Sequence, residues 1–339
     1  METKLLDIKA ENDSAINTAA QILKNGGIVA VPTETVYGLA ASAFSDNAIK
    51  NVFTAKGRPQ DNPLIVHISD MDMLYTVAKD IPQCAIECAK RFWPGPFTMV
   101  LKKTNAVCGS VSAGLDTVAV RMPSDKICQS IISKSGIPLA APSANRSGSP
   151  SPTTYSHVLS DLNGKIDAII MGDNCTFGIE STVVAINENE ARLLRPGAVT
   201  LEQLKEVLPD IIVDKAVLSE VEKGDKVASP GMKYKHYAPK AELYLIEGET
   251  KEYCDFVNGK NDGVAVCFAE EENLLKTKCF VYGSQNDPLS LAHSLFETLR
   301  TLDAQNIEKG YVHSPQKNGV GLAVYNRLIR ACAYRVIKL

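Results

Sequence analysis

Cations, hydroxyls and amides recur in this sequence where a predicted helix or strand ends. Lys56 and Arg58 flank a glycine directly after a helical pattern, and Arg121 and Arg195 each stand at the end of an apolar run. Guanidinium and ammonium groups beside neutral polar groups suit the binding of phosphates and carboxylates. The same residue types serve phosphoryl or nucleotidyl transfer, where positioning and charge neutralisation carry most of the catalysis. The full set is Thr35, Lys56, Arg58, Asn62, His67, Arg121, Ser143, Asn145, Ser151, Ser181 and Arg195.

Each of these residues also has a plain structural explanation. A basic helix end at Lys56 complements the helix dipole, and His67 in a buried strand is commonly a hydrogen-bonded core residue. A lone arginine at a strand end is commonly a surface residue. Taken together, the cations, hydroxyls and amides indicate an anion-binding α/β enzyme. The sequence has no GxxxxGK[ST] motif and no GxGxxG after a strand, so we predict neither a P-loop nor a dinucleotide site.

The stretch 138–153 organises the rest of the chain. Its prolines and Gly148 exclude a long helix or a central strand. Its Ser, Asn and Thr side chains can satisfy irregular backbone or bind a ligand. It leaves the apolar run 137–141, which predicts the end of a buried strand. A polar loop in this position is typical of an anion or nucleotide site, and a surface connection is the alternative.

Composition limits the classes of protein that this chain can be. With 339 residues it exceeds one ordinary core, so we expect two domains. Hydrophobic residues make up 45% and charged residues 22%, as in globular proteins, and the net charge of −3 means that anion binding has to be local. The apolar runs have strand length, far short of a membrane span, and the acidic N-terminus lacks a signal-peptide pattern. We therefore expect a cytoplasmic protein.

Cysteine and histidine are dispersed through the sequence. The nine cysteines form no CxxC pair, and the five histidines do not cluster with them. Cys84 and Cys88 are spaced i, i+4 in a helical pattern, which favours core packing. Metal clusters need tighter grouping. We therefore predict no protein-held metal site and no structural disulfide.

The first two hundred residues alternate between helical and strand patterns. Apolar spacing predicts helices over 13–24, 46–55 and 82–91. Several predicted strands follow one another without a helix between them, which favours a twisted mixed sheet with flanking helices over a purely parallel one. The predicted strands are 28–31, 64–68, 98–101, 117–123, 166–171 and 182–184.

The pattern changes after residue 208. We predict a linker over 209–240, whose part 223–240 is rich in Gly, Pro, Lys and Tyr. From 241 to 339, strands alternate with amphipathic helices, which predicts a smaller Rossmann-like, doubly wound α/β domain. The fold class is therefore α/β in both domains, 1–208 and 241–339. In the second domain we predict strands at 243–246, 263–268 and 279–282 and helices at 250–258, 289–304 and 323–333.

Six short motifs of the first domain occur in the order of a known family. They are Pro32–Leu39 (PTETVYGL), Lys56–Pro59 (KGRP) with Asn62–Leu64 (NPL), Trp93–Pro96 (WPGP), Arg121–Pro123 (RMP), Pro142–Asn145 (PSAN) and Leu194–Gly197 (LRPG). Together they resemble the YrdC-type L-threonylcarbamoyladenylate synthases (threonylcarbamoyl-AMP synthases). The resemblance covers roughly residues 10–200. The linker and second domain resemble the long form of that family, which has a C-terminal extension.

The resemblance implies a nucleotidyltransferase reaction. L-threonine, bicarbonate and ATP would give threonylcarbamoyl-AMP and pyrophosphate, for N6-threonylcarbamoyladenosine modification of tRNA next to the anticodon. The carbamate of threonine is a weak, anionic nucleophile that has to meet the α-phosphate. Repulsion between the two anions is the main obstacle, and cations reduce it.

The resemblance also implies residue roles. The catalytic set would be Lys56, Arg58, Ser143 and Asn145. ATP would contact Arg58, Asn62, Thr117, Ser143, Ser151, Arg195 and Tyr234. L-threonine would contact Thr35, His67, Arg121, the backbone at Ala141, and Ser181, with Arg121 as the partner of its carboxylate. Mg²⁺ would accompany the triphosphate, because it is a hard cation held mostly by phosphate oxygens.

The part of the linker around Tyr234 and His236 suggests a further role. With two lysines beside them, these side chains could fold over the nucleotide and exclude water. A flexible tether is the alternative.

Two other functions remain open from the sequence. Related domains occur in carbamoyl-transfer factors of hydrogenase maturation, but this chain lacks the length and the CxxC pairs of those proteins. A module that binds structured RNA without catalysis would show a basic domain, whereas acids and bases balance here.

For the synthase we expect a monomer without membrane contact, with at most weak tRNA binding, and a downstream threonylcarbamoyl transferase that receives the adenylate.

Overall fold

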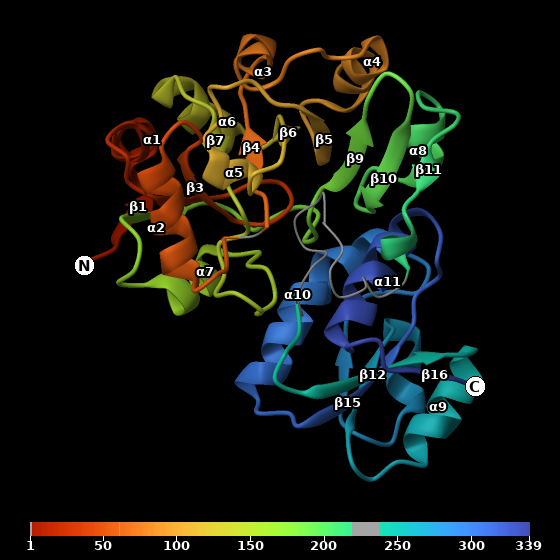
Figure 1. Cartoon of the computed structure of the whole chain (residues 1–339). Coiled ribbons are helices and arrows are strands. Elements are labelled where there is room, and N and C mark those ends of the chain that lie inside the picture. The colour runs from red at the N-terminus through yellow and green to blue at the C-terminus, as the bar shows by residue number, and fades with distance from the viewer. Residues whose placement is uncertain (1, 61, 219–236) are drawn as a thin grey trace. The chain divides into compact units, whose positions relative to one another are not determined.

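The computed structural model describes residues 2–60, 62–218 and 237–339 (Figure 1). These residues form two compact units. The first holds 2–60, 62–147, 151–176 and 180–218, and the second holds 148–150, 177–179 and 237–339. Much of the predicted linker, 209–240, lies outside the described residues, and its residues Ile212–Val213 pair with a strand of the first unit.

The first unit is built on an eleven-stranded mixed sheet, as the sequence predicts. Its strand order is β1-β8-β2-β3-β7-β4-β6-β5-β9-β10-β11. β4 and β6 are parallel, whereas β5 and β6 are antiparallel. The strands are β1 (Lys4–Asp7), β2 (Val29–Val31), β3 (Gly38–Ser42), β4 (Ile65–His67), β5 (Phe97–Lys102), β6 (Thr117–Arg121), β7 (Leu139–Ala140), β8 (Ala168–Met171), β9 (Thr182–Ile186), β10 (Ala191–Arg195) and β11 (Ile212–Val213).

Helices cover both faces of this sheet. Successive residues of a strand point to opposite faces, so alternate residues of β2 pack against different helices. Val29 and Val31 pack in one apolar cluster with Leu23 of α1 and residues of α6. Ala30, between them, joins a second cluster with Phe53 of α2. The helices are α1 (Ile8–Lys24), α2 (Asp46–Lys56), α3 (Met71–Val77), α4 (Gln83–Phe92), α5 (Gly109–Ser112), α6 (Lys126–Ser135), α7 (Tyr155–Leu162) and α8 (Leu201–Lys205), with the 3₁₀ turn η1 (Lys215–Val217).

The second unit contains a five-stranded parallel sheet in the order β14-β13-β15-β12-β16. Chain order and spatial order differ, as in doubly wound folds, so the predicted Rossmann-like architecture is confirmed. The strands are β12 (Glu242–Glu247), β13 (Val264–Cys267), β14 (Cys279–Val281), β15 (Lys309–His313) and β16 (Val336–Lys338). The helices are α9 (Thr250–Asn258), η2 (Ala269–Leu274), α10 (Pro288–Ala304) and α11 (Gly319–Ala331).

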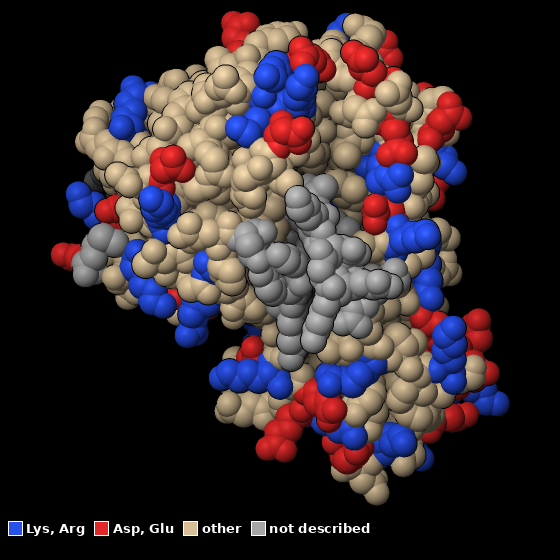
Figure 2. Space-filling view, in the orientation of Figure 1, with Lys and Arg blue, Asp and Glu red and all other residues tan. Residues whose placement is uncertain are grey.

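Surface charge shows no dominant sign. Figure 2 shows acidic and basic side chains interspersed over the face in view, in keeping with the net charge of −3. Across the described ranges, no helix is both long enough and apolar enough to cross a membrane.

Candidate active site

The end of α2 brings Lys56 into a polar loop. Gly57 adopts the left-handed conformation (φ 60°) and caps the helix, and the Arg58 N–H donates to the Phe53 carbonyl at 3.0 Å. This is a Schellman-type ending, which favours glycine because other residues strain there. The helix therefore ends directly after Lys56, whose side chain is only 3% exposed.

Lys56 ties together part of the loop 138–153. Its Nζ donates to the main-chain oxygens of Ser143 (2.5 Å) and Asn145 (2.6 Å), and lies 3.4 Å from Asn145 Oδ1. The Ser143 hydroxyl donates to Asn145 Oδ1 at 2.6 Å. Of the four residues predicted as catalytic, three thus form one hydrogen-bonded group, and the fourth, Arg58, lies two residues beyond Lys56.

Arg58 and Asn62 lie next to this group. Arg58 Nη2 is 3.5 Å from the Asn62 carbonyl, at the outer limit of a hydrogen bond. Asn62 is 1% exposed, and neither atom of its amide has a hydrogen-bond partner among the described residues. Leaving a buried amide unpaired is costly. A ligand that pairs with this amide would remove the cost, as expected of a nucleotide contact.

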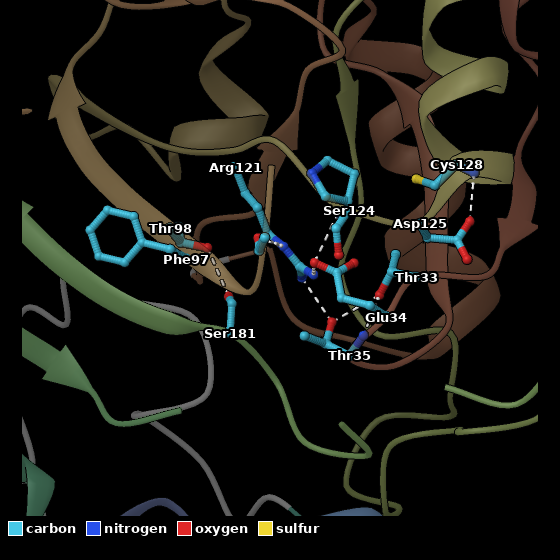
Figure 3. Close-up of polar contacts among 12 residues, drawn as sticks. Thr33, Glu34, Thr35, Phe97, Thr98, Arg121, Ser124, Asp125, Cys128 and Ser181 are labelled. Atoms are coloured by element: carbon cyan, nitrogen blue, oxygen red, sulfur yellow. Dashed lines mark hydrogen bonds and ion pairs between the residues drawn. The ribbon is translucent and has the colours of Figure 1, made fainter. Parts of the chain in front are cut away.

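A second buried group centres on Arg121, the last residue of β6 (Figure 3). Its Nη1 donates to Thr35 Oγ1 at 2.8 Å, its Nε donates to the Gly95 carbonyl at 3.2 Å, and its Nη2 forms an ion pair with Glu34 Oε1 at 2.8 Å. Arg121, Thr35 and Glu34 are all at most 6% exposed. Water is therefore largely excluded, which strengthens each of these interactions.

The side-chain hydroxyl of Thr35 can act only as a hydrogen-bond acceptor toward a ligand. The Thr33 hydroxyl donates to the Val36 carbonyl at 2.6 Å, so its proton is used there. The 2.8 Å contact between the Thr33 and Thr35 hydroxyls therefore has Thr35 as its donor. Because Thr35 also accepts from Arg121, only a lone pair of its oxygen remains.

His67 lies beside Arg121 and carries no charge at neutral pH. It ends β4 in register with Arg121 on the neighbouring parallel strand. Burial, and then the charge of Arg121, lower the pKa of His67 to about 3. His67 therefore adds polarity to this group without adding charge.

Ser181 links the strands on the other side of Arg121. Its hydroxyl is 2.8 Å from that of Thr98, which pairs with Arg121 across β5 and β6 (Figure 3). Arg195 donates through Nε to the Ser181 carbonyl at 3.0 Å and through Nη2 to its hydroxyl at 3.2 Å. A predicted ATP contact, Arg195, is thus bonded directly to a predicted threonine contact.

Ser151 is held through a buried carboxylate. Its hydroxyl donates to Glu180 Oε1 at 2.6 Å, and the two residues are 1% and 8% exposed. Glu180 directly precedes Ser181, so this bond fixes the position of Ser151 relative to the Ser181–Arg195 pair.

Main-chain hydrogen bonds join the group around Lys56 to the group around Arg121. The segment that carries Thr35 runs beside the loop that carries Ser143. The Ala144 N–H donates to the Tyr37 carbonyl and the Leu39 N–H donates to the Pro142 carbonyl, both at 2.8 Å. The cation-centred groups of Lys56 and Arg121 therefore belong to one site.

The backbone of Ala141, a predicted threonine contact, lies beside the strand of His67. Its N–H donates to the Ile65 carbonyl of β4 at 2.9 Å. That N–H is therefore already paired in the structure.

Thr117, a predicted ATP contact, lies away from Arg121. It begins β6 whereas Arg121 ends it, so the two are separated by about 13 Å of strand. Tyr234, like His236, lies outside the described residues.

Two buried carboxylates of the site, Glu34 and Glu180, were not predicted from the sequence. Glu34 belongs to one of the six motifs, and Glu180 directly precedes a predicted threonine contact. The sequence feature that could have indicated these two carboxylates is a charged residue next to a buried strand. Glu34 follows β2 and Glu180 precedes β9.

Comparison with known proteins identifies the family. A family model described as "Telomere recombination" (Sua5, YciO and YrdC) matches residues 21–197, and one described as "Threonylcarbamoyl-AMP synthase, C-terminal domain" matches 199–333. Threonylcarbamoyl-AMP synthase of Pyrococcus abyssi is 43% identical over 96% of both chains. That of Bacillus subtilis is 41% identical over the full length of both.

The chain belongs to the threonylcarbamoyl-AMP synthase family. The resemblance inferred from the six motifs is thereby confirmed.

Solved structures of this family extend the match to three dimensions. The crystal structure of P. abyssi Sua5 complexed with L-threonine superimposes with a TM-score of 0.90, at 40% identity and complete coverage of both chains. A second Sua5 structure from that organism, of a double alanine variant, gives a TM-score of 0.91 at 40% identity, covering 99% of this chain and 98% of that one. The predicted fold class, a mixed-sheet α/β unit followed by a smaller α/β unit, is confirmed.

Proposed function

We propose that this protein joins L-threonine, bicarbonate and ATP into threonylcarbamoyl-AMP and pyrophosphate. The observation that carries the proposal is the joining of two cation-centred groups in one site. Arg121 with Thr35 suits an amino acid, and Lys56 with Arg58 and the Ser143 loop suits a nucleotide. Main-chain hydrogen bonds between the segments 37–39 and 142–144 hold the two groups together.

Threonine fits the group around Arg121. The guanidinium donates to the carboxylate, and the lone pair of Thr35 accepts from the hydroxyl or the ammonium group. The uncharged His67 avoids a second positive charge beside the ammonium group. In the P. abyssi relative, L-threonine is the ligand of a solved complex.

ATP fits the group around Lys56. Lys56 and Arg58 supply positive charge, and the Asn62 amide supplies a buried donor and acceptor. Ser151 has already given its proton to Glu180, so it meets the nucleotide as an acceptor and suits a ribose hydroxyl or an amino group better than a phosphate.

The reaction has two bond-forming steps. The threonine amine attacks the carbon of bicarbonate and water is lost, which gives the carbamate. A carbamate oxygen then attacks the α-phosphorus, and the bond to the β-phosphate oxygen breaks to release pyrophosphate. The cations of the site reduce the repulsion between carbamate and phosphate and stabilise the charge that builds up on the leaving group.

We propose that Mg²⁺ enters with ATP. Within residues 2–60, 62–218 and 237–339, no group of three His, Cys, Asp or Glu side chains could hold a metal ion. This donor set, which is rich in cations, hydroxyls and amides, fits a Mg²⁺ held chiefly by phosphate oxygens rather than by the protein. When bound, the ion neutralises phosphate charge and favours departure of pyrophosphate.

The product is an activated carbamoyl donor for N6-threonylcarbamoyladenosine in tRNA. We propose that it passes to a downstream threonylcarbamoyl transferase, so that tight tRNA binding by this chain is unnecessary. We also propose a monomer that acts in the cytoplasm.

Pyrophosphate release tests the proposal. The purified protein with ATP, bicarbonate and Mg²⁺ should release pyrophosphate only when L-threonine is added, and Arg58→Ala should abolish most of that release. If no amino acid supports release, the site is not that of a synthase. The remaining candidate is then the RNA-binding module, which direct binding of structured RNA would reveal.

A further inference from the structure

Glu34 is a buried carboxylate in the threonine group for which the proposed reaction has no role. It lies between Thr33 and Thr35, in the segment that follows β2, and is 6% exposed. Its Oε1 accepts the Ser124 N–H at 3.0 Å and pairs with Arg121 Nη2 at 2.8 Å (Figure 3). In the proposed reaction, Arg121 binds the carboxylate of the substrate. Glu34 carries a second carboxylate that is attracted to the same guanidinium and so competes with the substrate, and its presence needs an explanation.

The contacts of Arg121 show what Glu34 contributes. The guanidinium meets Gly95 through Nε, Thr35 through Nη1 and Glu34 through Nη2. These three partners lie along its edges and fix its plane and its direction. A guanidinium has five N–H groups, and these three contacts engage only three of them. Donors therefore remain for a ligand carboxylate.

Glu34 is itself held firmly in its charged state. Burial disfavours the carboxylate, but the charge of Arg121 and the Ser124 N–H outweigh burial and lower its pKa. The second oxygen, Oε2, is buried and has no hydrogen-bond partner within the described part of the chain. A carboxylate in this position stays ionised and keeps its attraction for the guanidinium throughout the neutral pH range.

We propose that Glu34 is a positioning residue for threonine recognition. It holds the Arg121 guanidinium in one orientation, with donors directed at the threonine carboxylate, before the substrate arrives. A long arginine side chain that was free would have to be ordered on binding, at a cost in affinity. Glu34 acts through Arg121 and does not contact the nucleotide, so it sets the affinity for threonine and not that for ATP. The inference rests on the proposed function, since it takes Arg121 as the carboxylate partner.

The test compares Glu34→Ala and Glu34→Gln in the full-length protein. Threonine-dependent pyrophosphate release is measured with threonine and ATP varied separately, and threonine binding is measured directly by calorimetry. In Glu34→Ala, KM and Kd for threonine should rise about tenfold to a hundredfold, the range expected for losing a charge-assisted contact. KM for ATP should stay within about twofold. Glu34→Gln keeps an oxygen for Ser124 and Arg121, and should recover part of the loss.

Asp167→Asn is the matched control for Glu34→Gln. Asp167 Oδ2 accepts the Ile28 N–H at 2.8 Å in the same unit, and it has no contact with Arg121. The control removes a carboxylate that accepts a main-chain N–H without touching the threonine group. It should leave both KM values unchanged.

Several outcomes would overturn the proposal. An unchanged threonine Kd in folded Glu34→Ala does so, and so does an equal rise of KM for threonine and for ATP, which indicates general damage to the fold. If Glu34→Ala does not fold, Glu34→Gln decides by itself: no selective loss of threonine affinity contradicts the proposal. If the wild-type protein releases no pyrophosphate, the proposed function fails, and calorimetry with threonine still decides the role of Glu34.

Discussion

Lys56 and Arg121 meet their surroundings in opposite ways. Lys56 donates to the main-chain oxygens of Ser143 and Asn145, which are neutral, whereas Arg121 is paired with the carboxylate of Glu34. The positive charge of Arg121 is partly offset by this carboxylate, which favours a single carboxylate as the ligand of that group. An amino acid, with its one carboxylate, therefore suits the group around Arg121.

Truncation of either cation of the nucleotide group should slow the reaction. We expect Lys56→Ala and Arg58→Ala each to cost about 3 kcal/mol of transition-state stabilisation, about a hundredfold in kcat/KM, as for the loss of one oxyanion donor. Steady-state pyrophosphate release measures the effect. Lys102→Ala, which removes a lysine that pairs with Asp80 at the surface, should change little. Full activity in both site variants would exclude these roles.

The buried, neutral His67 should make stability depend on pH. The pKa of His67 is lowered to about 3 from 6.5, so between these values the unfolded chain binds a proton that the folded chain does not. The stability contribution is therefore greatest above about pH 6.5 and is lost as the pH falls toward 3, by at most about 1.4 kcal/mol per pH unit.

Comparison with His67→Gln isolates this effect from the carboxylates that titrate in the same range. Urea unfolding of both proteins between about pH 4 and pH 7 should show a shallower pH dependence in the variant. Identical slopes would mean that folding does not lower the pKa of His67, which would contradict this account.

Residue types and motif order predict which residues lie together, but not the contacts among them. Arg121, Thr35 and Ser181 are predicted as one set, and they lie in one network of contacts through Thr98 and the paired strands. Glu34 was not predicted, because the spacing of residues in the sequence does not show an ion pair between distant segments. Thr117 is an expected ATP contact only through the resemblance, and in the structure it lies at the opposite end of β6 from Arg121.

At the scale of elements, the C-terminal end of α2 can be tested directly, because it delivers Lys56 to the loop. Gly57 has φ +60°, and a Cβ there would meet nothing within 4 Å. Gly57→Ala should therefore destabilise the protein through backbone strain alone, by about 1–2 kcal/mol. Gly57→Asn should lose less, because asparagine tolerates this conformation. Chemical denaturation measures both.

Gly109→Ala is the matched control for this test. Gly109 also has open space around its Cβ position but no positive φ. It should lose little stability, and a loss equal to that of Gly57→Ala would contradict the strain argument.

Elements with strong periodicity follow from the sequence, and elements fixed by distant partners do not. Helix α2 and strands β4, β5 and β6 lie within a few residues of their predicted bounds. Strand β3 has no predicted counterpart because four of its five residues are small, yet all five are buried between β2 and β7. β1 pairs with β8 across more than 160 residues, a partnership that local sequence cannot show. Helix α1 begins at Ile8 rather than 13, because Asp7 caps it.

At the scale of the whole molecule, the two units match the two parts of one family, with 43% identity to the P. abyssi synthase across nearly the full chain. The small net charge of −3 agrees with an enzyme whose substrates are small anions bound in a local group of cations. For such an enzyme we predict that the bicarbonate carbon enters the nucleotide product.

The most direct test of that claim uses ¹³C-labelled bicarbonate. The full-length protein is mixed with ATP, Mg²⁺ and L-threonine, and the nucleotide products are separated and analysed by mass spectrometry. We predict an adenylate that contains threonine and the heavy carbon, formed together with pyrophosphate and absent with Arg58→Ala. An adenylate of threonine without the heavy carbon, or no adenylate at all, would contradict the proposed reaction.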